Sequence, residues 1–313
     1  DDVQVVGLLA LAEQHVAPAE RLFRGGADLC HHTQYRWLPT RLPSVAMIHD
    51  LVFLDSERYM GSSAAGRMSA FARRAALEAR ILTTPSETVA DEVSARLGVP
   101  RERVVATPLG VDHVLRGPRG TRVPPGLACG TDVAPGPGYL FTAARIETRK
   151  NLGVILRAFE QLNVPDVRWK IAGIRGAGAE AFEGALRRSP ARESIDLLGH
   201  VSEASLRELT LGALAFVLVP LDEGFGLGPL EAMALGTPAV TSRVPVVSEV
   251  CGGGAILVDP LDDAALAQAL ERLVTDSDYR GARANAGTEH AKGFTWERTA
   301  ARTMDAYHRA LSP

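Results

Sequence analysis

The sequence predicts an α/β protein with two domains, each built from strands that alternate with helices. At 313 residues the chain is long enough for two α/β domains of ordinary size. Short β-branched and aliphatic runs alternate with segments of helical periodicity along most of its length. Between His113 and Gly138 the sequence becomes rich in glycine and proline and loses this periodicity, which is typical of a linker between domains.

Composition, charge and cysteines narrow the class of protein. Hydrophobic and charged contents of 46% and 23% are those of a soluble globular chain. The net charge of −3 supplies no global positive field, so nucleic acid is not expected as a main partner. Cys30, Cys129 and Cys251 are odd in number and lack CxxC spacing, which predicts a reducing compartment without disulfides or a zinc site. The sequence has no apolar run of about 18 residues and no signal peptide before its first strand, so we expect a cytoplasmic protein.

The first half of the chain predicts parallel strands with helices between them. After a strand-like run at 3–6, the expected strands are 27–32, 44–48 and 81–84, and the expected helices are 64–80 and a segment that Ser86 caps and Gly98 ends. His49 and Asp50 follow the strand at 44–48, at the carboxyl end where ligands bind in open α/β sheets. From the residues alone, a helix cap at Asp50 and a core histidine at His49 are the simpler interpretation.

The helix expected at 64–80 has an apolar face, with its arginines elsewhere. Such a face usually packs on the core of the protein. A peripheral contact with an acidic membrane is the alternative, which we do not favour. The residues of the apolar face are Met68, Phe71, Ala72, Ala75, Ala76 and Ala79.

The stretch from 216 to 240 predicts a buried strand, a glycine-rich loop and a helix. The strand at 216–219 ends at Pro220, Pro229 suits the first turn of the helix, and Gly236 ends it. Unbonded N–H groups and the helix dipole make such a helix start an anion site. The glycines of the loop allow a phosphate to approach the backbone closely.

Two carboxylates flank this expected anion site, Glu223 before the loop and Glu231 in the expected first turn of the helix. Because carboxylates repel phosphate, their expected partners are hydroxyls, and a ligand that carries both groups is a nucleotide sugar. The alternative is that Glu231 only complements the helix dipole and that Glu223 is a solvated loop residue.

The start of the predicted second domain carries two cationic side chains. Arg145 lies at the carboxyl end of the strand expected at 139–142, and Lys150 with Asn151 opens the next helix. Two cations aimed at one crevice can neutralise a diphosphate leaving group without a metal ion. As an isolated pair they would usually be surface charges. Arg149 lies between them and is expected to contribute less than either of them.

The rest of the second half continues the alternation of strands and helices. Strands are expected at 169–173, 195–201 and 239–241, a loop at 242–248, and helices at 202–211, 262–274 and 297–311. The glycine-rich turn at 173–178 has the order GxxGxG and not the dinucleotide order GxGxxG. The DxD at 276–278 falls between two helices, which favours a turn with a helix cap over a metal site.

These motifs closely resemble those of the retaining glycosyltransferases of family 4. The resemblance rests on the two glutamates separated by seven residues, on the segment 231–238 after them, on the Arg-x-x-x-x-Lys-Asn pattern at 145–151 and on the strand end at 45–51. It covers nearly the whole chain from about Asp28, although Leu109 stands where the family usually has asparagine. It implies the GT-B fold, in which two Rossmann-like domains face each other and the last helix crosses back to the first domain.

The resemblance also implies a division of the chain. Residues 1–115, with the helix at 296–313, would form an N-terminal acceptor-side domain, 113–138 the linker, and 139–295 a C-terminal domain that binds the nucleotide sugar. Family members normally have an earlier strand, a glycine-rich loop and a helix before the point where this sequence starts. We therefore expect the N-terminal part of the first domain to be missing.

The resemblance assigns roles to the candidate site residues. Arg145 and Lys150 would grip the donor's diphosphate, Glu223 would bind the hydroxyls of the donor sugar, and His49 would contact the sugar or phosphate. Glu231 would accept hydrogen bonds from the ribose. Backbone groups would read the nucleobase and bind the phosphates at Gly199, His200, Val201, Gly224, Phe225, Gly226 and Leu227.

The function expected from this resemblance is transfer of a sugar from a nucleotide-diphosphate donor, such as a UDP- or GDP-sugar, to an acceptor hydroxyl, with retention and without a metal. The acceptor would be a small molecule, a glycan or a lipid-linked sugar, as in bacterial polysaccharide synthesis or antibiotic and other secondary-metabolite glycosylation. No cofactor besides the nucleotide-sugar co-substrate is expected. Retention by same-face attack and retention through a covalent intermediate both stay open. The alternatives are a nucleotide-sugar 2-epimerase and a catalytically silent nucleotide-sugar-binding module.

Overall fold

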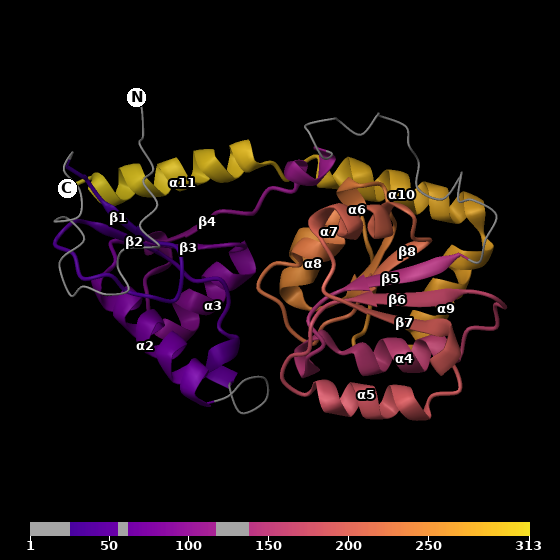
Figure 1. The fold of residues 1–313 in the computed structure, drawn as a ribbon. Helices are drawn as coiled ribbons and strands as arrows, with labels where there is room; N and C mark the ends of the chain where they lie inside the picture. The colour runs from indigo at the N-terminus through magenta and orange to yellow at the C-terminus, as the bar shows by residue number, and fades with distance from the viewer. Residues whose placement is uncertain (1–25, 56–61, 117–137) are drawn as a thin grey trace.

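The computed structural model describes residues 26–55, 62–116 and 138–313. The strand-like run expected at 3–6 and most of the expected linker, 117–137, lie outside the described residues. Within the described ranges the strands form one sheet of order β1-β2-β3-β4 and another of order β10-β9-β8-β5-β6-β7 (Figure 1). All neighbouring strands in both sheets are parallel. The predicted α/β class is confirmed.

The first sheet contains β1 (Cys30–His32), β2 (Ser44–Met47), β3 (Ile81–Thr84) and β4 (Val104–Ala106). Its strands point alternate side chains to opposite faces, as a period of two requires. On one face Ala46, Leu82 and Val104 share a core with α2 (Ser62–Glu78) and α3 (Glu87–Leu97). The apolar face expected on α2 lies in this core, where Phe71 and Ala75 are buried.

The second sheet contains β5 (Tyr139–Ala143), β6 (Arg168–Ala172), β7 (Ile195–Gly199), β8 (Ala215–Leu218), β9 (Ala239–Ser242) and β10 (Ile256–Val258). One face carries α4 (Leu152–Glu160), α5 (Ala179–Arg188) and α9 (Asp263–Thr275), and the other carries α6 (Glu203–Leu211) and α7 (Leu227–Ala234) (Figure 1). The helix α10 (Ser277–Ala291) packs against α7 and α9. Short 3₁₀ turns occur at Val52–Asp55, Arg101–Arg103, Asp112–Leu115, Thr148–Lys150 and Arg192–Ser194.

A buried threonine joins the central strands of the second sheet. The Thr142 hydroxyl accepts a hydrogen bond from Trp169 Nε1 at 2.9 Å and donates to the Val217 carbonyl at 2.6 Å. All three groups are buried, and an unpaired hydroxyl there would be costly. These bonds therefore fix β5, β6 and β8 side by side, and with them the strand ends that carry the candidate site.

Several expected helix starts are confirmed by their side-chain caps. The Ser86, Ser202 and Asp276 side chains accept hydrogen bonds from the first turns of α3, α6 and α10. The DxD at 276–278 is therefore a turn with a cap, as expected. No helix in the described ranges combines the length and the apolar composition that crossing a membrane requires.

Two expectations for the second half were wrong. The segment 242–248, expected as a loop, contains the start of α8 (Pro245–Cys251), because Pro245 suits a first turn and Val246, Val247 and Val250 are buried at helical spacing. The helix α7 begins at Leu227 rather than near Pro229, after Gly226 turns the chain with a φ of 96°. Glu231 consequently lies in the second turn of α7 and not in its first.

The last helix, α11 (Trp296–Leu311), packs on the first sheet as expected (Figure 1). Its Ala306 and Ala310 are buried against Val45, Ile81 and Val105, on the face opposite α2 and α3. The chain therefore passes between the two halves before Asp112 and again near Trp296. At this double crossing the Trp296 amide donates to Asp112 Oδ1 at 2.7 Å.

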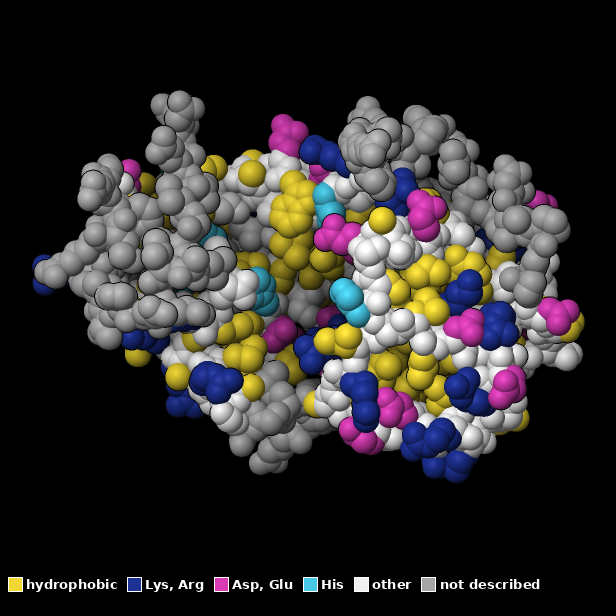
Figure 2. Space-filling model, viewed as in Figure 1, with side chains coloured by type: hydrophobic (Ala, Val, Ile, Leu, Met, Phe, Trp, Pro, Cys, Tyr) yellow, Lys and Arg dark blue, Asp and Glu magenta, His cyan; other side chains and the backbone are white. Residues whose placement is uncertain are grey.

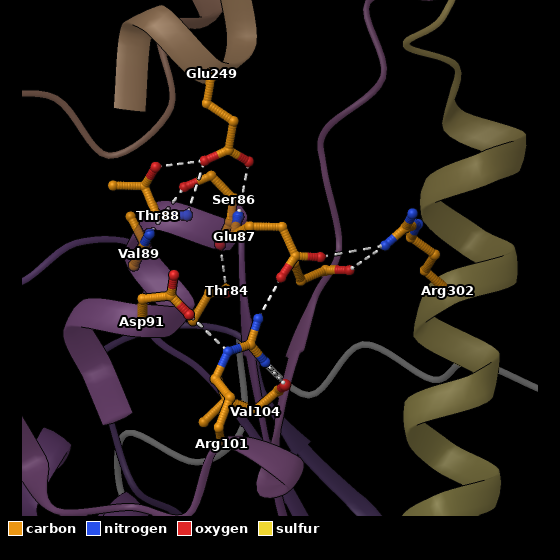
Figure 3. Close-up of polar contacts among 11 residues, drawn as sticks. Thr84, Ser86, Glu87, Thr88, Val89, Asp91, Arg101, Val104, Glu249 and Arg302 are labelled. Carbon is orange, nitrogen blue, oxygen red and sulfur yellow. Dashed lines mark hydrogen bonds and ion pairs between the residues drawn. The ribbon is translucent and has the colours of Figure 1, made fainter. Parts of the chain in front are cut away.

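A carboxylate from α8 joins the second half to the first (Figure 3). The two oxygens of Glu249 accept the backbone N–H groups of Glu87 and Thr88, each at 2.8 Å. Those groups are the first donors of α3 and have no partner within the helix. Since Ser86 satisfies the next donor, Val89, the start of α3 is capped jointly by its own serine and by the other half of the molecule.

Replacing Glu249 is expected to destabilise the protein. Glu249→Ala leaves two α3 donors to water and removes a negative charge from the helix start, which costs about 1 kcal/mol of unfolding free energy. Urea unfolding measures the change. The matched control is Glu289→Ala, an exposed helical glutamate paired with Lys292, whose expected effect is below about 0.5 kcal/mol. Equal midpoints for the two variants would contradict a stabilising role for the Glu249 contact.

Candidate active site

The strand-end motifs of the two halves meet at one place. A Cβ added to Gly224 would lie 2.5 Å from the His49 carbonyl oxygen and 3.2 Å from Asp50 Cβ. The backbone of the glycine-rich loop therefore touches the segment that follows β2, and only glycine allows this approach. Acidic, basic and histidine side chains gather along the junction between the halves (Figure 2).

The glycine-rich loop leads into the N-terminus of α7 as the sequence predicts. Gly226 caps the helix in the left-handed conformation, so the first N–H groups from Leu227 onward lack intrahelical partners. The Phe225 side chain is buried and packs edge-on against Phe294, with ring centroids 6.2 Å apart. Phe225 therefore anchors the loop, and only its backbone is available to a ligand.

Glu223 lies between two cations from a single 3₁₀ turn. Its Oε2 is 3.3 Å from Arg149 Nη1, and its Oε1 accepts a hydrogen bond from Lys150 Nζ. The three side chains are only 12%, 18% and 14% exposed in the order Glu223, Arg149, Lys150. Burial of a carboxylate at this depth requires paired charges, and these two cations supply them.

Arg145 stands at the outer end of a chain of ion pairs. Its side chain is 61% exposed and approaches Glu147 at 3.8 Å, while Glu147 contacts Arg149 at 3.4 Å. Arg149, which the sequence did not single out, is the residue that contacts both Glu147 and Glu223. Its guanidinium also donates to the Asp222 carbonyl at 3.3 Å. No periodic signal could have identified it, because it lies in a 3₁₀ turn between two elements.

His49 and Asp50 are fixed by Tyr35, a residue that the sequence analysis missed. The Tyr35 hydroxyl accepts the N–H groups of His49 and Asp50 at 3.2 and 3.0 Å and donates to the Asp50 carbonyl at 2.9 Å. His49 Nε2 lies 2.9 Å from the Thr33 carbonyl, which can only accept, so Nε2 carries the proton and Nδ1 is left as an acceptor. Tyr35 lies in an irregular segment 14 residues before His49, so neither spacing nor periodicity connects the two.

Asp50 combines a capping role with a place at the site. Its Oδ1 accepts the N–H of Val52 at 3.2 Å, which caps the 3₁₀ turn Val52–Asp55. Burial raises the pKa of Asp50, while the charge of Arg149 opposes this. The capping interpretation is therefore correct, and the same carboxylate also belongs to the charged group around Arg149.

The charged group at the junction is electrostatically coupled. Burial alone would lower the pKa of Arg149, but the carboxylates of Glu223, Asp50, Glu147 and Asp222 raise it above its ordinary value. Burial raises the pKa of Asp222 from 3.8 to about 6, with Arg149 acting in the opposite direction. Asp222 therefore changes its charge at mildly acidic pH.

The expected nucleobase segment follows β7 at the same edge of the second sheet. Gly199 has a φ of 66°, and its carbonyl accepts the Gly173 N–H at 2.8 Å. Gly199 and His200 are exposed, and Val201 packs partly against the core between the sheet and α6. Because β5 to β8 are parallel, this segment and the glycine-rich loop both lie beyond carboxyl ends of strands in the same sheet.

Glu231 contacts a residue that the sequence did not suggest. Its Oε1 lies 3.2 Å from His113 Nε2, and its side chain is 25% exposed. Burial raises the pKa of Glu231, whereas its hydrogen bond with His113 lowers it. Of the candidate residues, the structure thus gathers His49, Glu223, Gly224 and Lys150 closely, while Arg145 contacts Glu147 and Glu231 contacts His113.

Two sequence families and two relatives that this chain resembles are all glycosyltransferases. The model of the glycosyl transferases group 1 matches residues 131–290, just over half of the chain, and that of glycosyltransferase family 4 matches residues 11–115. O-antigen chain mannosyltransferase B of Escherichia coli is 28% identical over 90% of this chain and 74% of its own length. D-inositol 3-phosphate glycosyltransferase of Arthrobacter sp. (strain FB24) is 33% identical over 74% of this chain, which spans 55% of that protein.

Solved structures show the same fold. Anabaena Alr3699/HepE in complex with UDP-glucose superposes with a TM-score of 0.68 at 17% identity, over 86% of this chain and 72% of that one. Sucrose-phosphate synthase (tll1590) from Thermosynechococcus elongatus gives a TM-score of 0.67 at 20% identity, over 91% and 74%. The predicted GT-B architecture of two α/β halves is confirmed.

The raised pKa of Asp222 makes stability depend on pH. Its ionisation is less favourable in the folded chain, so its contribution is fully present below about pH 4 and is lost as pH rises to about 6. Asp222→Asn stays neutral, and we expect it to unfold at higher urea than the wild type above about pH 6, with the difference vanishing near pH 4. Asp305→Asn, at an exposed position on α11, is the control without this trend. A difference for Asp222→Asn that is constant with pH would contradict the buried-carboxylate account.

Proposed function

The chain belongs to the group 1 glycosyltransferases, with family 4 character in its first half, and on this premise we propose that it moves a sugar from a nucleotide-diphosphate donor to an acceptor hydroxyl. In the proposed reaction the anomeric configuration is retained and no metal ion is required. The donor is a UDP- or GDP-sugar, and the acceptor is a small molecule, a glycan or a lipid-linked sugar. The proposed location of the protein is the cytoplasm.

The observation that carries the proposal is the contact of Gly224 with the His49 carbonyl. It supports a single donor site that uses groups from both halves. Glu223 and the start of α7, next to Gly224 in the sequence, come from the second half, and His49 comes from the first. Arg149 and Lys150 lie directly beside Glu223. The proposed site therefore offers acceptors for sugar hydroxyls next to cations for a diphosphate.

In the proposed mechanism the site stabilises the charge that develops on the leaving diphosphate. The bond between the anomeric carbon and the phosphate oxygen breaks, the acceptor oxygen bonds to that carbon, and the acceptor's proton passes to the departing phosphate. Lys150, Arg145 and the N–H groups after Gly226 hold the diphosphate. Glu223 and His49 orient the sugar, Glu231 binds the ribose, and backbone groups of Gly199 to Val201 bind the nucleobase.

The relatives indicate the kind of donor and acceptor. Mannosyltransferase and inositol-phosphate glycosyltransferase activities are named for the relatives, and the solved neighbour HepE holds UDP-glucose. We propose a bacterial role in surface polysaccharide synthesis or in glycosylation of a secondary metabolite. A thermal-shift screen of UDP-, GDP-, ADP- and dTDP-sugars identifies the donor, since binding to the folded state raises its apparent stability.

Replacement of Lys150 tests the proposed diphosphate grip. Lys150→Ala removes a fixed positive charge from the leaving group, and we expect kcat to fall about 100-fold or more. Glu223→Ala is expected to lose activity as well, through loss of contacts with the donor sugar. Lys292→Ala is the matched control, because Lys292 is 66% exposed and pairs with Glu289 across one helical turn. Turnover near the wild-type level in both Lys150→Ala and Glu223→Ala would reject this site.

Chelation tests the metal-independent chemistry. If the cations of the chain and the amides of α7 balance the diphosphate charge, transfer continues at an unchanged rate in excess EDTA. The measurement is initial rate with and without chelator, followed by addition of Mg²⁺ or Mn²⁺. Activity that EDTA abolishes and a divalent ion restores would contradict the proposal. Incubation with donor alone separates transfer from epimerisation, because only an epimerase converts the donor sugar.

A further inference from the structure

The chain crosses between the two halves near residues 110–113 and again near 294–296, and backbone contacts join the two crossings. The Val111 N–H donates to the Phe294 carbonyl at 3.0 Å, and a Cβ on Gly110 would lie 2.2 Å from the Trp296 amide nitrogen. Together with the bond from the Trp296 amide to Asp112, these contacts fix residues 110–113 against 294–296. His113 therefore projects from a segment whose position is strongly determined.

The hydrogen bonds of His113 determine which of its ring nitrogens carries the proton. The indole Nε1 of Trp296 is 3.0 Å from His113 Nδ1, and an indole N–H can only donate. Nδ1 must therefore be the acceptor, which leaves the proton on Nε2. That Nε2 faces Glu231 Oε1 at 3.2 Å and donates to it.

From these two hydrogen bonds we propose that His113 is a positioning residue for recognition of the donor's ribose. It holds the Glu231 carboxylate in the orientation that accepts the ribose hydroxyls. The inference rests on the proposed function, in which Glu231 binds the ribose. His113 contacts Oε1 of the carboxylate, and in this proposal Oε2 accepts from the ribose. Trp296 acts one step further away by fixing the His113 tautomer.

The physical need for such a partner follows from the surroundings of Glu231. The carboxylate is about three-quarters covered, and burial disfavours its charged form. A hydrogen bond to the charged form opposes this effect and also restricts the rotamer of a flexible side chain. His113 supplies both from outside α7, on the passage of chain that connects the two halves.

The test compares binding of a nucleoside diphosphate and its 2′,3′-dideoxy counterpart, which lacks the hydroxyls that Glu231 is proposed to bind. Either UDP or GDP is used, whichever binds the wild type more tightly by calorimetry. We expect the wild type to prefer the ribonucleotide by about 10-fold or more, since a site built for hydroxyls rejects ligands without them. Glu231→Ala and His113→Ala are both expected to reduce that preference to about twofold, with a raised donor KM and a much smaller change in kcat.

Two isosteric variants distinguish positioning from a general structural role. The amide nitrogen of His113→Gln can replace Nε2 and donate to Glu231, so we expect it to restore most of the ribose preference. The shorter amide of His113→Asn replaces Nδ1 instead and is expected not to restore it. Trp296→Phe keeps the ring packing but loses the N–H, and we expect a partial loss of preference. His308→Ala, at an exposed position on α11, is the control histidine replacement.

The outcomes separate the inference from the proposed function. If Glu231→Ala abolishes the ribose preference and His113→Ala keeps it, the role of His113 is rejected while the proposed site stands. If Glu231→Ala itself keeps the preference, the ribose assignment of the proposed function fails and the inference fails with it. Should His113→Ala not fold, the comparison of His113→Gln with His113→Asn decides, and equal preferences in those two would overturn the inference.

Discussion

The carboxylate of Glu223, held between Arg149 and Lys150, is the interaction on which the candidate site depends. A buried carboxylate that lost either cation would leave charge uncompensated, which is far more costly than breaking an exposed pair. The loop and the turn are further joined by the Leu221 N–H, which donates to the Arg149 carbonyl at 2.9 Å. The glutamate motif and the Arg-Lys motif therefore form one structural unit, although about 70 residues separate them in the sequence.

The same pair has a consequence for the proposed chemistry. Lys150 donates a hydrogen bond to Glu223, so in the proposed reaction a phosphate must replace this bond to make its full contact with Lys150. An arriving diphosphate competes with Glu223 for Lys150. The Glu223 oxygen that loses Lys150 can then accept hydrogen bonds from hydroxyls of the sugar. In the proposed reaction, the donor phosphate and the donor sugar are therefore bound by two groups that pair with each other in this structure, and Arg149 is a second partner of Glu223.

Much of the fold could be predicted from the sequence, because period and capping are local signals. Ile81–Thr84 and Glu87–Leu97 have the bounds that apolar runs, a serine cap and a terminal glycine indicate. The helix α8 was missed because a seven-residue segment with several valines has too few turns to separate helix from loop. The motif residues could be predicted in kind, whereas Arg149, Tyr35 and His113 could not, since each acts through contacts that only the folded chain brings together. Arg149 shows this most directly. The spacing pattern selects Arg145 as the site residue, whereas Arg149 is the more buried of the two arginines.

Glu223 in the loop and Glu231 in α7 are held by different kinds of partner, and this difference follows their proposed roles. Glu223 faces full positive charges, which attract phosphate as well, so its pairing can change when a donor enters. Glu231 faces a neutral imidazole, because a ring nitrogen that accepts from the Trp296 indole cannot carry a proton. A neutral donor orients a carboxylate without cancelling its charge, which keeps Glu231 a strong acceptor and gives an incoming phosphate no cation to compete for. The pairing of Glu223 with cations therefore suits the sugar-phosphate end of the donor, where a bond breaks in the proposed reaction. The pairing of Glu231 with neutral His113 suits the ribose, which the reaction does not change.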